Sequence, residues 1–363
     1  MAEEKFEDYV YLNKICLSSV GLWPLADGVS KWRLYLNNFH IFITYALFLL
    51  VMLIPEALDL YMVWGNIDAI VENVCVNIYL ASAAIKFYQM IVKKKTFKDL
   101  LNIMKRDWDS TVHKGVSKDR RNILLRYASF SQNLTKIFAL LAYVICTQLF
   151  LLPLIFGMNN NPIRKRWYPS SAWYYFDQSS DSAYACFYCL QLFIGVGLGI
   201  SVNIGLDSFC CVAISHICAQ LIIFQKELLE LGKHSKVSQG IIKQIIQKHN
   251  HQFRVTQLLN EIFNNISLCQ LLLSCVAICT AGFQLIISLE VGNAAYQSLW
   301  TNLPTSSCKE IKLLILRSQR PMFITAGKMY ILSLSRFIAI LKTSMQCLSY
   351  LRASYNHKDR LGQ

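Results

Sequence analysis

The sequence of 363 residues predicts an all-α fold, a multi-span transmembrane bundle of helices with helical extensions into the cytoplasm. Three observations predict this fold class. Long apolar runs carry no charge, the segments between them are short and basic, and charged residues make up 16% of the chain, against about 25% in soluble domains. Four runs of 19 to 28 residues contain no Asp, Glu, Lys or Arg: Leu36–Ile54, Ile137–Gly157, Ala183–Leu206 and Ile262–Leu289. A helix needs about 20 apolar residues to cross about 30 Å of hydrocarbon, so these runs are expected to lie in a membrane.

The elements follow in order. Residues 1–35 are expected to be a cytoplasmic segment, because their acidic start, MAEEKFEDY, lacks the features of a cleaved signal peptide. Lys86 stands near one end of the second span, where its long stem is expected to snorkel to the interface. The fourth run continues apolar through Phe209–Phe224, interrupted only by Asp207, and is expected to extend into the aqueous phase. The candidate spans are 36–56, 70–92, 131–157, 183–214, 258–289 and 321–351.

The distribution of Lys and Arg between the spans predicts the orientation. The first loop, Pro55–Ala69, has no base, whereas Lys93–Phe130 has eleven and Gln225–Arg254 has six. Cytoplasmic loops carry the excess of bases, so the second and fourth loops, and with them the N-terminus, are predicted to be cytoplasmic.

Several function classes are disfavoured. The net charge of +14 lies in loops beside spans and not in a nucleic-acid motif, so no nucleic-acid partner is expected. The sequence contains no paired carboxylates and no nucleophile–base motif. We therefore expect that the protein is not an enzyme and binds no cofactor. Most of the 13 cysteines lie in apolar runs and are expected to pack as small hydrophobes, Cys186 and Cys189 included. His249 and His251 are expected to be solvated loop residues and not metal ligands.

The last run differs from the others in its polar residues. Lys328, Ser335, Lys342 and Ser349 recur every seven residues, and Gln346 falls one turn from Lys342 on the same side. Two interpretations remain open: interfacial snorkelling with hydrogen bonds between helices, or a helix that lines an aqueous path.

The blocks after residue 290 carry a family resemblance. Ala294–Trp300 (AAYQSLW), Leu314–Pro321 (LILRSQRP), Thr325–Lys328 (TAGK) and Ile340–Ser344 (ILKTS) follow in the order of the insect odorant receptor C-terminal signature. Leu268–Leu285 resembles the fifth span of that family. The chain therefore resembles the insect odorant receptor family.

This resemblance implies an odorant-binding subunit of a heteromeric, odorant-gated cation channel. Such subunits pair with a shared co-receptor in a heterotetramer, with the N-terminus inside, in the plasma membrane of olfactory neuron dendrites. It implies a ligand-pocket bundle over residues 36–289, a connector and cytoplasmic anchor over 290–320, and a pore-lining helix and tail over 321–363. The polar stripe and the resemblance together make Lys342, Gln346, Ser349, Tyr350 and Ser354 the pore candidates.

Small volatile organic ligands of this family bind in the outer half of the membrane. The candidate residues for this pocket combine aromatic and aliphatic walls with a few hydroxyls and amides; the alternative for each is ordinary helix packing. They are Val74, Ile78, Tyr79, Tyr143, Thr147, Gln148, Phe187, Tyr188 and Gln191.

The chain departs from the family pattern at one place. Only the nine residues Leu285–Asn293 join the blocks between which the family has its sixth span. Six spans are countable instead of seven, so either the last helix is inverted, or the fifth segment does not cross fully, or the polypeptide is a variant that does not gate ions. The hypothesis is a membrane-inserted but impaired receptor.

Two other functions compete with this one. A secondary transporter would show repeated halves and broken helices, and no internal repeat is found. A gustatory-type receptor subunit would carry a Thr-Tyr and Gln-Phe block in its last helix, which is absent.

Overall fold

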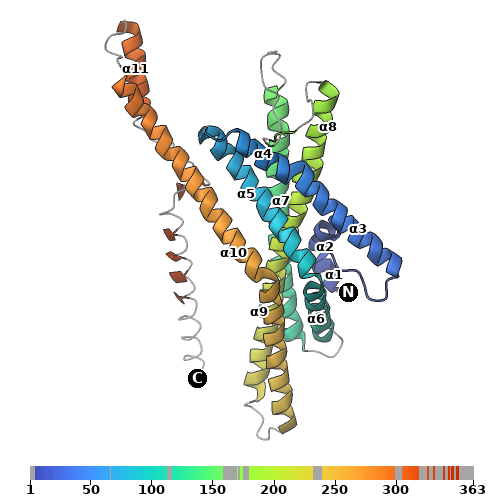
Figure 1. Cartoon of the computed structure of the whole chain (residues 1–363). Helices are drawn as coiled ribbons and strands as arrows, with labels where there is room; N and C mark the ends of the chain where they lie inside the picture. The colour runs from blue at the N-terminus through green and yellow to red at the C-terminus, as the bar shows by residue number, and fades with distance from the viewer. Residues whose placement is uncertain are drawn as a thin grey trace. The chain divides into compact units, whose positions relative to one another are not determined.

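The computed structural model describes residues 5–65, 67–112, 117–157, 170, 172–174, 180–231, 239–298 and 305–318, with short stretches between 325 and 350. These residues are helical almost throughout, which confirms the all-α class (Figure 1). The chain forms two compact units, Met1–Met62 with Tyr79–Gln270, and Val63–Ile78 with Leu271–Gln363.

The first unit begins with two short helices and a long apolar one. Helices α1 (Phe6–Tyr9) and α2 (Tyr11–Ser19) precede α3 (Lys31–Phe48), which continues through a π-helical stretch η1 (Leu49–Leu53) into α4 (Ile54–Met62). Gly21, at φ +75°, turns the chain between α2 and α3, and a Cβ there would stand 2.9 Å from the Ile41 side chain. Glycine is required at this position for both reasons.

The middle of the chain contains one amphipathic helix between two long ones. They are α5 (Ile67–Val92), α6 (Lys94–Val112) and α7 (Lys118–Gly157). On α6 the buried residues Phe97, Leu101, Met104 and Trp108 recur at helical spacing, so one face packs inward while the lysines stay outside. The basic second loop is thus mostly helix.

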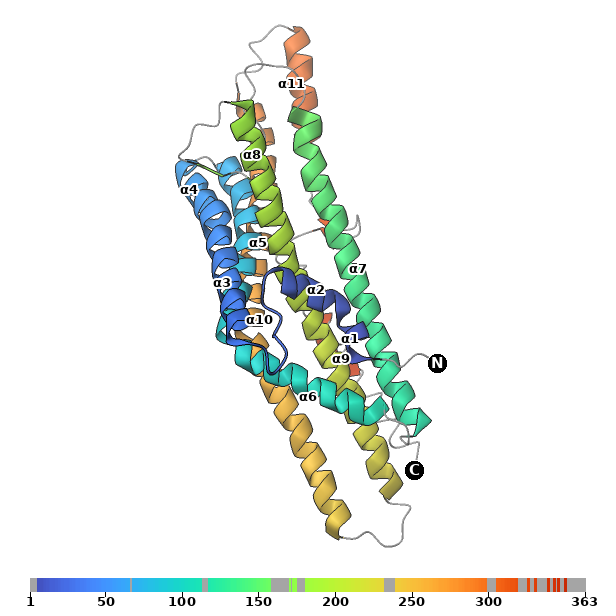
Figure 2. The same cartoon turned by 90° about the vertical axis from the view of Figure 1, so that its right-hand side faces the viewer.

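The remaining elements are α8 (Asp181–Gln191), η2 (Leu192–Leu198), α9 (Gly199–Leu231), α10 (Gln239–Gln297), α11 (Thr305–Ser318), β1 (Thr325–Ala326) and β2 (Tyr330–Ile331). The Ser180 hydroxyl accepts a hydrogen bond from the Ala183 amide and caps α8. Helix α9 runs alongside α7 in both views (Figures 1 and 2), and its length confirms that the fourth apolar run extends well beyond one bilayer.

The predicted last helix, 321–351, differs in part from the structure. Within it β1 and β2 pair antiparallel, with Thr325 opposite Ile331. Thr325, Tyr330 and Ile331 are β-branched or aromatic residues, which favour strands. The described helical residues of this segment lie at and after 338.

The core of the first unit lies where α1, α2, α6, α7, α9 and the first part of α10 meet. Phe97 of α6 packs edge-on against Phe209 of α9 with ring centroids 4.8 Å apart, and Trp108 meets Tyr9 of α1 at 4.9 Å. The Asn13 amide of α2 donates to the Ser208 hydroxyl of α9 at 2.7 Å. These contacts fix the N-terminal helices against the bundle.

Two helical stretches among the described residues are long and apolar enough to cross a bilayer by length and composition: Lys31–Met62 and Asp181–Glu230. Large apolar side chains on α3 and α7 stay exposed, among them Phe42, Leu140 and Tyr143. Exposed apolar faces of this kind suit contact with lipid.

Acid is expected to loosen α1 from α6. The Lys105 ammonium donates to Glu7 at 2.5 Å and holds the pKa of that carboxyl below its ordinary value. A depressed carboxyl pKa contributes stability that is present above the unfolded pKa, about 4.3, and is lost as the pH falls through the folded value. The hydrogen-exchange protection factors of the α1 amides should decrease once the pH is below about 4. The Lys105→Gln variant should lack this acid step, and an unchanged step would contradict the assignment.

Candidate functional site

A polar network joins α8 to the π-helical break between α3 and α4. Pro55 has no N–H to offer the preceding turn, and the carbonyl of Val51, four residues earlier, accepts the Tyr174 hydroxyl at 2.8 Å. The Trp173 amide donates to the Pro55 carbonyl at 3.0 Å. The segment 172–174 is therefore fastened to this break.

Gln191, at the end of α8, is the centre of this network. Its Oε1 accepts from the Ser170 amide at 3.2 Å, and its Nε2 donates to the Ser170 carbonyl at 3.3 Å and to the Tyr174 hydroxyl at 3.2 Å. Gln191 is buried, and its amide is engaged with protein groups. This predicted ligand residue therefore connects the end of α8 to the segment 170–174 through hydrogen bonds. We call this connection the latch.

The aromatic candidates on α8 lie beside this latch. Phe187 stacks on Tyr174 with ring centroids 4.7 Å apart, and Tyr188 is buried against Tyr184 at 5.8 Å. Tyr79 of α5 lies near Gly199, where a Cβ would stand 3.8 Å from its ring. The glycine lets the Tyr79 ring approach α9 closely.

The other predicted pocket residues are less constrained. Tyr143 and Gln148 on α7 are exposed, and the Thr147 side chain lies outside the described residues. Val74 and Ile78 are half-buried in the second unit. The structure therefore groups Phe187, Tyr188 and Gln191 within the first unit.

Sequence reasoning missed three residues of this region: Glu56, Ser170 and Tyr174. Glu56 is fully buried. A charged residue directly after a proline at the end of an apolar run was an available signal for Glu56. Nothing local distinguishes Ser170 or Tyr174, because they reach the site from a loop.

Removing the Tyr174 hydroxyl is expected to loosen this region. In Tyr174→Phe the Val51 carbonyl loses its donor while the stacking on Phe187 is kept, at a cost of about 1 kcal/mol. The apparent melting temperature of the purified chain in detergent should fall slightly. Tyr11→Phe removes the hydroxyl of a tyrosine on α2 that is 59% exposed, and it should change the melting temperature less. Equal effects of the two variants would argue against the latch.

The predicted pore residues fall in the second unit. Lys342, Gln346, Ser349 and Tyr350 are exposed within short helical stretches, and Ser354 lies outside the described residues. Pore lining thus stays a prediction.

Lys86 does not snorkel to the interface, contrary to the expectation. Its ammonium is buried and donates to Asp207 at 2.8 Å and to Asn203 at 2.9 Å, both on α9. An opposite charge on the neighbouring helix offers the ammonium a better partner than a distant headgroup. The lone Asp207 in the fourth apolar run was the signal for this pair.

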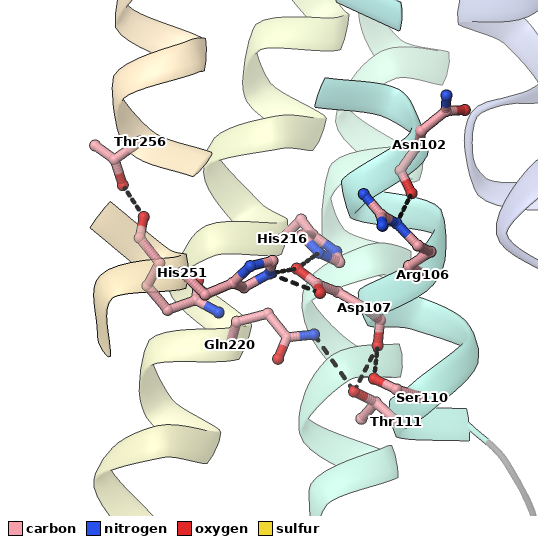
Figure 3. Close-up of polar contacts among 10 residues, drawn as sticks. Asn102, Arg106, Asp107, Ser110, Thr111, His216, Gln220, His251 and Thr256 are labelled. Carbon is pink, nitrogen blue, oxygen red and sulfur yellow. Dashed lines mark hydrogen bonds and ion pairs between the residues drawn. The ribbon is translucent and has the colours of Figure 1, made fainter. Parts of the chain in front are cut away.

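A polar cavity of about 530 Å³ lies where α6, α7, α9 and α10 meet. Nε2 of His251 lies 2.9 and 3.0 Å from the two carboxylate oxygens of Asp107, and His216 Nε2 lies 3.8 Å from the same carboxylate. Figure 3 shows Asp107 of α6 between the two imidazoles, which come from α9 and α10. Arg120 and Lys248 both reach Glu227 at 2.6 Å on another wall. This cluster joins four helices.

His251 therefore departs from the expectation of a solvated loop residue, whereas His249 is exposed as expected. His249 packs its ring against Phe224 and Phe253, and His251 is half-buried in the cluster. Helix α10 begins earlier than the sequence suggested and carries His251 into the bundle. In the part of the chain that the structure describes, no group of three His, Cys, Asp or Glu side chains is arranged to hold a metal ion.

Comparison with known proteins covers nearly the whole chain. The family model described as "7tm Odorant receptor" matches residues 66–289 and 287–345. Odorant receptor 13a of Drosophila melanogaster is 24% identical over 403 residues, covering 92% of this chain and 93% of that protein. Odorant receptor 10 of Aedes albopictus is 38% identical over 69 residues, 19% of this chain and 18% of that protein.

Solved structures show the same fold. The insect olfactory receptor OR5 from Machilis hrabei superposes with a TM-score of 0.58 at 15% identity, covering 95% of this chain and 99% of that one. Its complex with eugenol gives a TM-score of 0.59 at 14% identity, covering 94% and 96%. Family members are membrane receptors and not enzymes. The chain accordingly belongs to the 7tm odorant receptor family of insects.

Proposed function

We propose that this chain is the odorant-binding subunit of a heteromeric ligand-gated cation channel, paired with a shared co-receptor. The observation that carries the proposal is the family match over residues 66–345, which includes every candidate pocket residue and, of the five pore candidates, Lys342. The subunit would be a multi-pass protein of the plasma membrane of olfactory neuron dendrites, with its N-terminus in the cytoplasm. The basic character of α6 and of the start of α10 supports this orientation.

The ligand is expected to be a small volatile molecule that binds among aromatic walls. A structural relative is in complex with eugenol. Here Tyr79, Phe187 and Tyr188 supply aromatic surface, while the latch formed by Gln191 holds α8 in place. Aromatic walls with few polar groups suit a small, weakly polar ligand.

Gating is expected to involve the last helix, where Lys342, Gln346, Ser349, Tyr350 and Ser354 are the proposed pore residues. A polar stripe on a membrane helix faces protein or water. Exposure of the first four in the isolated chain suits residues that face a central path in an oligomer.

The join at Leu285–Asn293 bears on activity. Helix α10 runs unbroken through it to Gln297, over 59 residues or roughly 90 Å. The two segments of the family match adjoin at residues 287–289. The alignment with Odorant receptor 13a spans 403 positions, more than this chain of 363 residues, so it opens gaps in this chain. These features support the hypothesis of a receptor that inserts in the membrane but is impaired in gating.

Co-expression with the co-receptor tests both parts of the proposal. Surface labelling of epitope tags in intact cells should leave an N-terminal tag unlabelled, and odorant-evoked calcium entry should be weak or absent. Insertion of the missing span from a full-length relative at Leu285–Asn293 should restore entry. Normal odorant currents from the unmodified chain would disprove the impairment, and a labelled N-terminal tag would disprove the orientation.

A further inference from the structure

A second cavity lies between the N-terminal segment and α6, away from the proposed odorant pocket. It measures about 400 Å³, and α1, α2, the loop Gly21–Asp27, the start of α3 and α6 line it. Its apolar wall includes Phe6, Val10, Trp23 and Leu101, and its polar wall includes Lys14, Lys98 and Lys105 beside Glu7 and Asp27. An apolar wall beside a basic one suits an amphiphile with an anionic end.

Three ammonium groups face the cavity. Lys98 pairs with Asp27 and Lys105 with Glu7, each at 2.5 Å. Lys14 also lines the cavity, and no described carboxylate lies within 4 Å of its ammonium. The lining therefore holds three cations against two carboxylates, which favours an anion.

The pair between Lys98 and Asp27 is the one that an anion could open most easily. Asp27 is 79% exposed and sits in a loop next to Gly28, whose φ of +81° marks a tight turn. Exposed ion pairs contribute little to stability. A phosphate monoester carries about −1.5 to −2 charges at neutral pH. It can therefore replace the single negative charge of Asp27 as the partner of Lys98.

The level of this cavity matches that of lipid headgroups. At the start of α3, Trp32 and Tyr35 are exposed and stack with ring centroids 6.1 Å apart, close in sequence to the bases Lys31 and Arg33. Such aromatic pairs mark the membrane–water interface. The Lys94 ammonium at the start of α6 donates to Asn38 of α3 at 3.1 Å, so the start of α6 lies beside α3 three residues after Tyr35.

The cavity opens within a turn of those residues, because Asn37 of α3 and Lys98 of α6 line it. A lipid of the adjacent leaflet can therefore place its headgroup in the cavity while its chains stay in the bilayer. Basic pockets on the cytoplasmic side of membrane proteins bind anionic headgroups in this way.

We infer that the cavity formed by Lys14, Lys98 and Lys105 binds a phospholipid of the adjacent leaflet whose headgroup ends in a phosphate monoester. Binding would fasten the N-terminal segment to α6 at the membrane surface. The inference is independent of odorant binding and gating, because its test measures lipid retention and needs no channel activity.

The test uses the full chain reconstituted in nanodiscs and measures retained lipid by native mass spectrometry. Discs of phosphatidylcholine with phosphatidylinositol 4,5-bisphosphate are compared with discs matched in surface charge by phosphatidylserine, a phosphodiester. The bisphosphate lipid should be retained and phosphatidylserine should not. Lys14→Gln and Lys98→Gln should each weaken retention roughly fivefold, the effect of one base near an anionic surface.

Matched variants separate binding from general charge and from folding. Lys226→Gln removes a lysine that is similarly paired, with Asp119, far from this cavity, and should leave retention unchanged. Asp27→Asn removes the competing carboxylate and should raise retention about two- to fivefold, whereas a merely structural role for Asp27 would lower it.

Any one of three results with the lipid discs would overturn the inference. They are equal losses in Lys226→Gln and Lys98→Gln, lower retention in Asp27→Asn, and equal retention of phosphatidylserine. Soluble inositol trisphosphate is the remaining arm. Tight binding of it to the chain in discs of phosphatidylcholine alone would assign the cavity to a soluble phosphate and would likewise overturn the lipid.

Discussion

Asp207→Ala is expected to destabilise the chain by on the order of 2–3 kcal/mol, because it leaves the Lys86 ammonium buried with Asn203 as its remaining partner. The Lys86 side chain is 3% exposed and that of Asp207 is 53% exposed. We expect a smaller loss of stability than for a fully buried ion pair, because the Asp207 side chain is half exposed.

This asymmetry makes the prediction specific. Lys86→Met leaves a carboxylate that can still be hydrated, so it should cost only about 1 kcal/mol. The double variant Lys86→Met, Asp207→Leu removes both charges and should recover most of the loss from Asp207→Ala. Apparent melting temperatures and the folded fraction on size exclusion in detergent rank the three variants by stability. A Lys86→Met variant less stable than Asp207→Ala would show that the buried ammonium is not the dominant cost.

Gly205→Val is expected to cost about 2–3 kcal/mol by overpacking the crossing of α2 and α9. A Cβ at Gly205 would stand 2.9 Å from Leu17 Cδ2 and 3.1 Å from Cys16 Cβ. Leu17 is fully buried and cannot move aside. The shift would also part the Asn13 amide from the Gly205 carbonyl and the Ser208 hydroxyl, which accept from it at 3.2 and 2.7 Å.

Gly197→Ala is the matched control for this substitution. It lies in the same long apolar helical stretch, and the nearest atom to an added Cβ is the Leu192 carbonyl oxygen at 3.9 Å. Alanine is the better helix former, so this variant should be neutral or slightly stabilising. Melting temperatures in detergent compare the two variants. Equal losses would indicate a general intolerance of this helix and not the contact with α2.

The sequence by itself determined which segments form helices and to which family the chain belongs. Charge-free runs such as Ala183–Leu206 predict helices because a backbone in hydrocarbon must satisfy its own hydrogen bonds. The excess of apolar residues through Phe209–Phe224 likewise predicted the extension of α9. The C-terminal blocks, from Ala294–Trp300 onward, carried the family assignment that the comparisons confirmed.

The pairing of polar groups across the bundle was decided only by the tertiary structure. Lys86 and Asp207 are 121 residues apart, and Tyr174 reaches Val51 across 123. Periodicity within one helix reports which face is apolar, but it does not report which helix lies opposite. The cost of an unpaired polar group in a buried site selects the partner once the helices are packed. For this reason Lys86 was wrongly predicted to snorkel to the interface, and the hydrogen bonds of Gln191 to Ser170 and Tyr174 were not predicted.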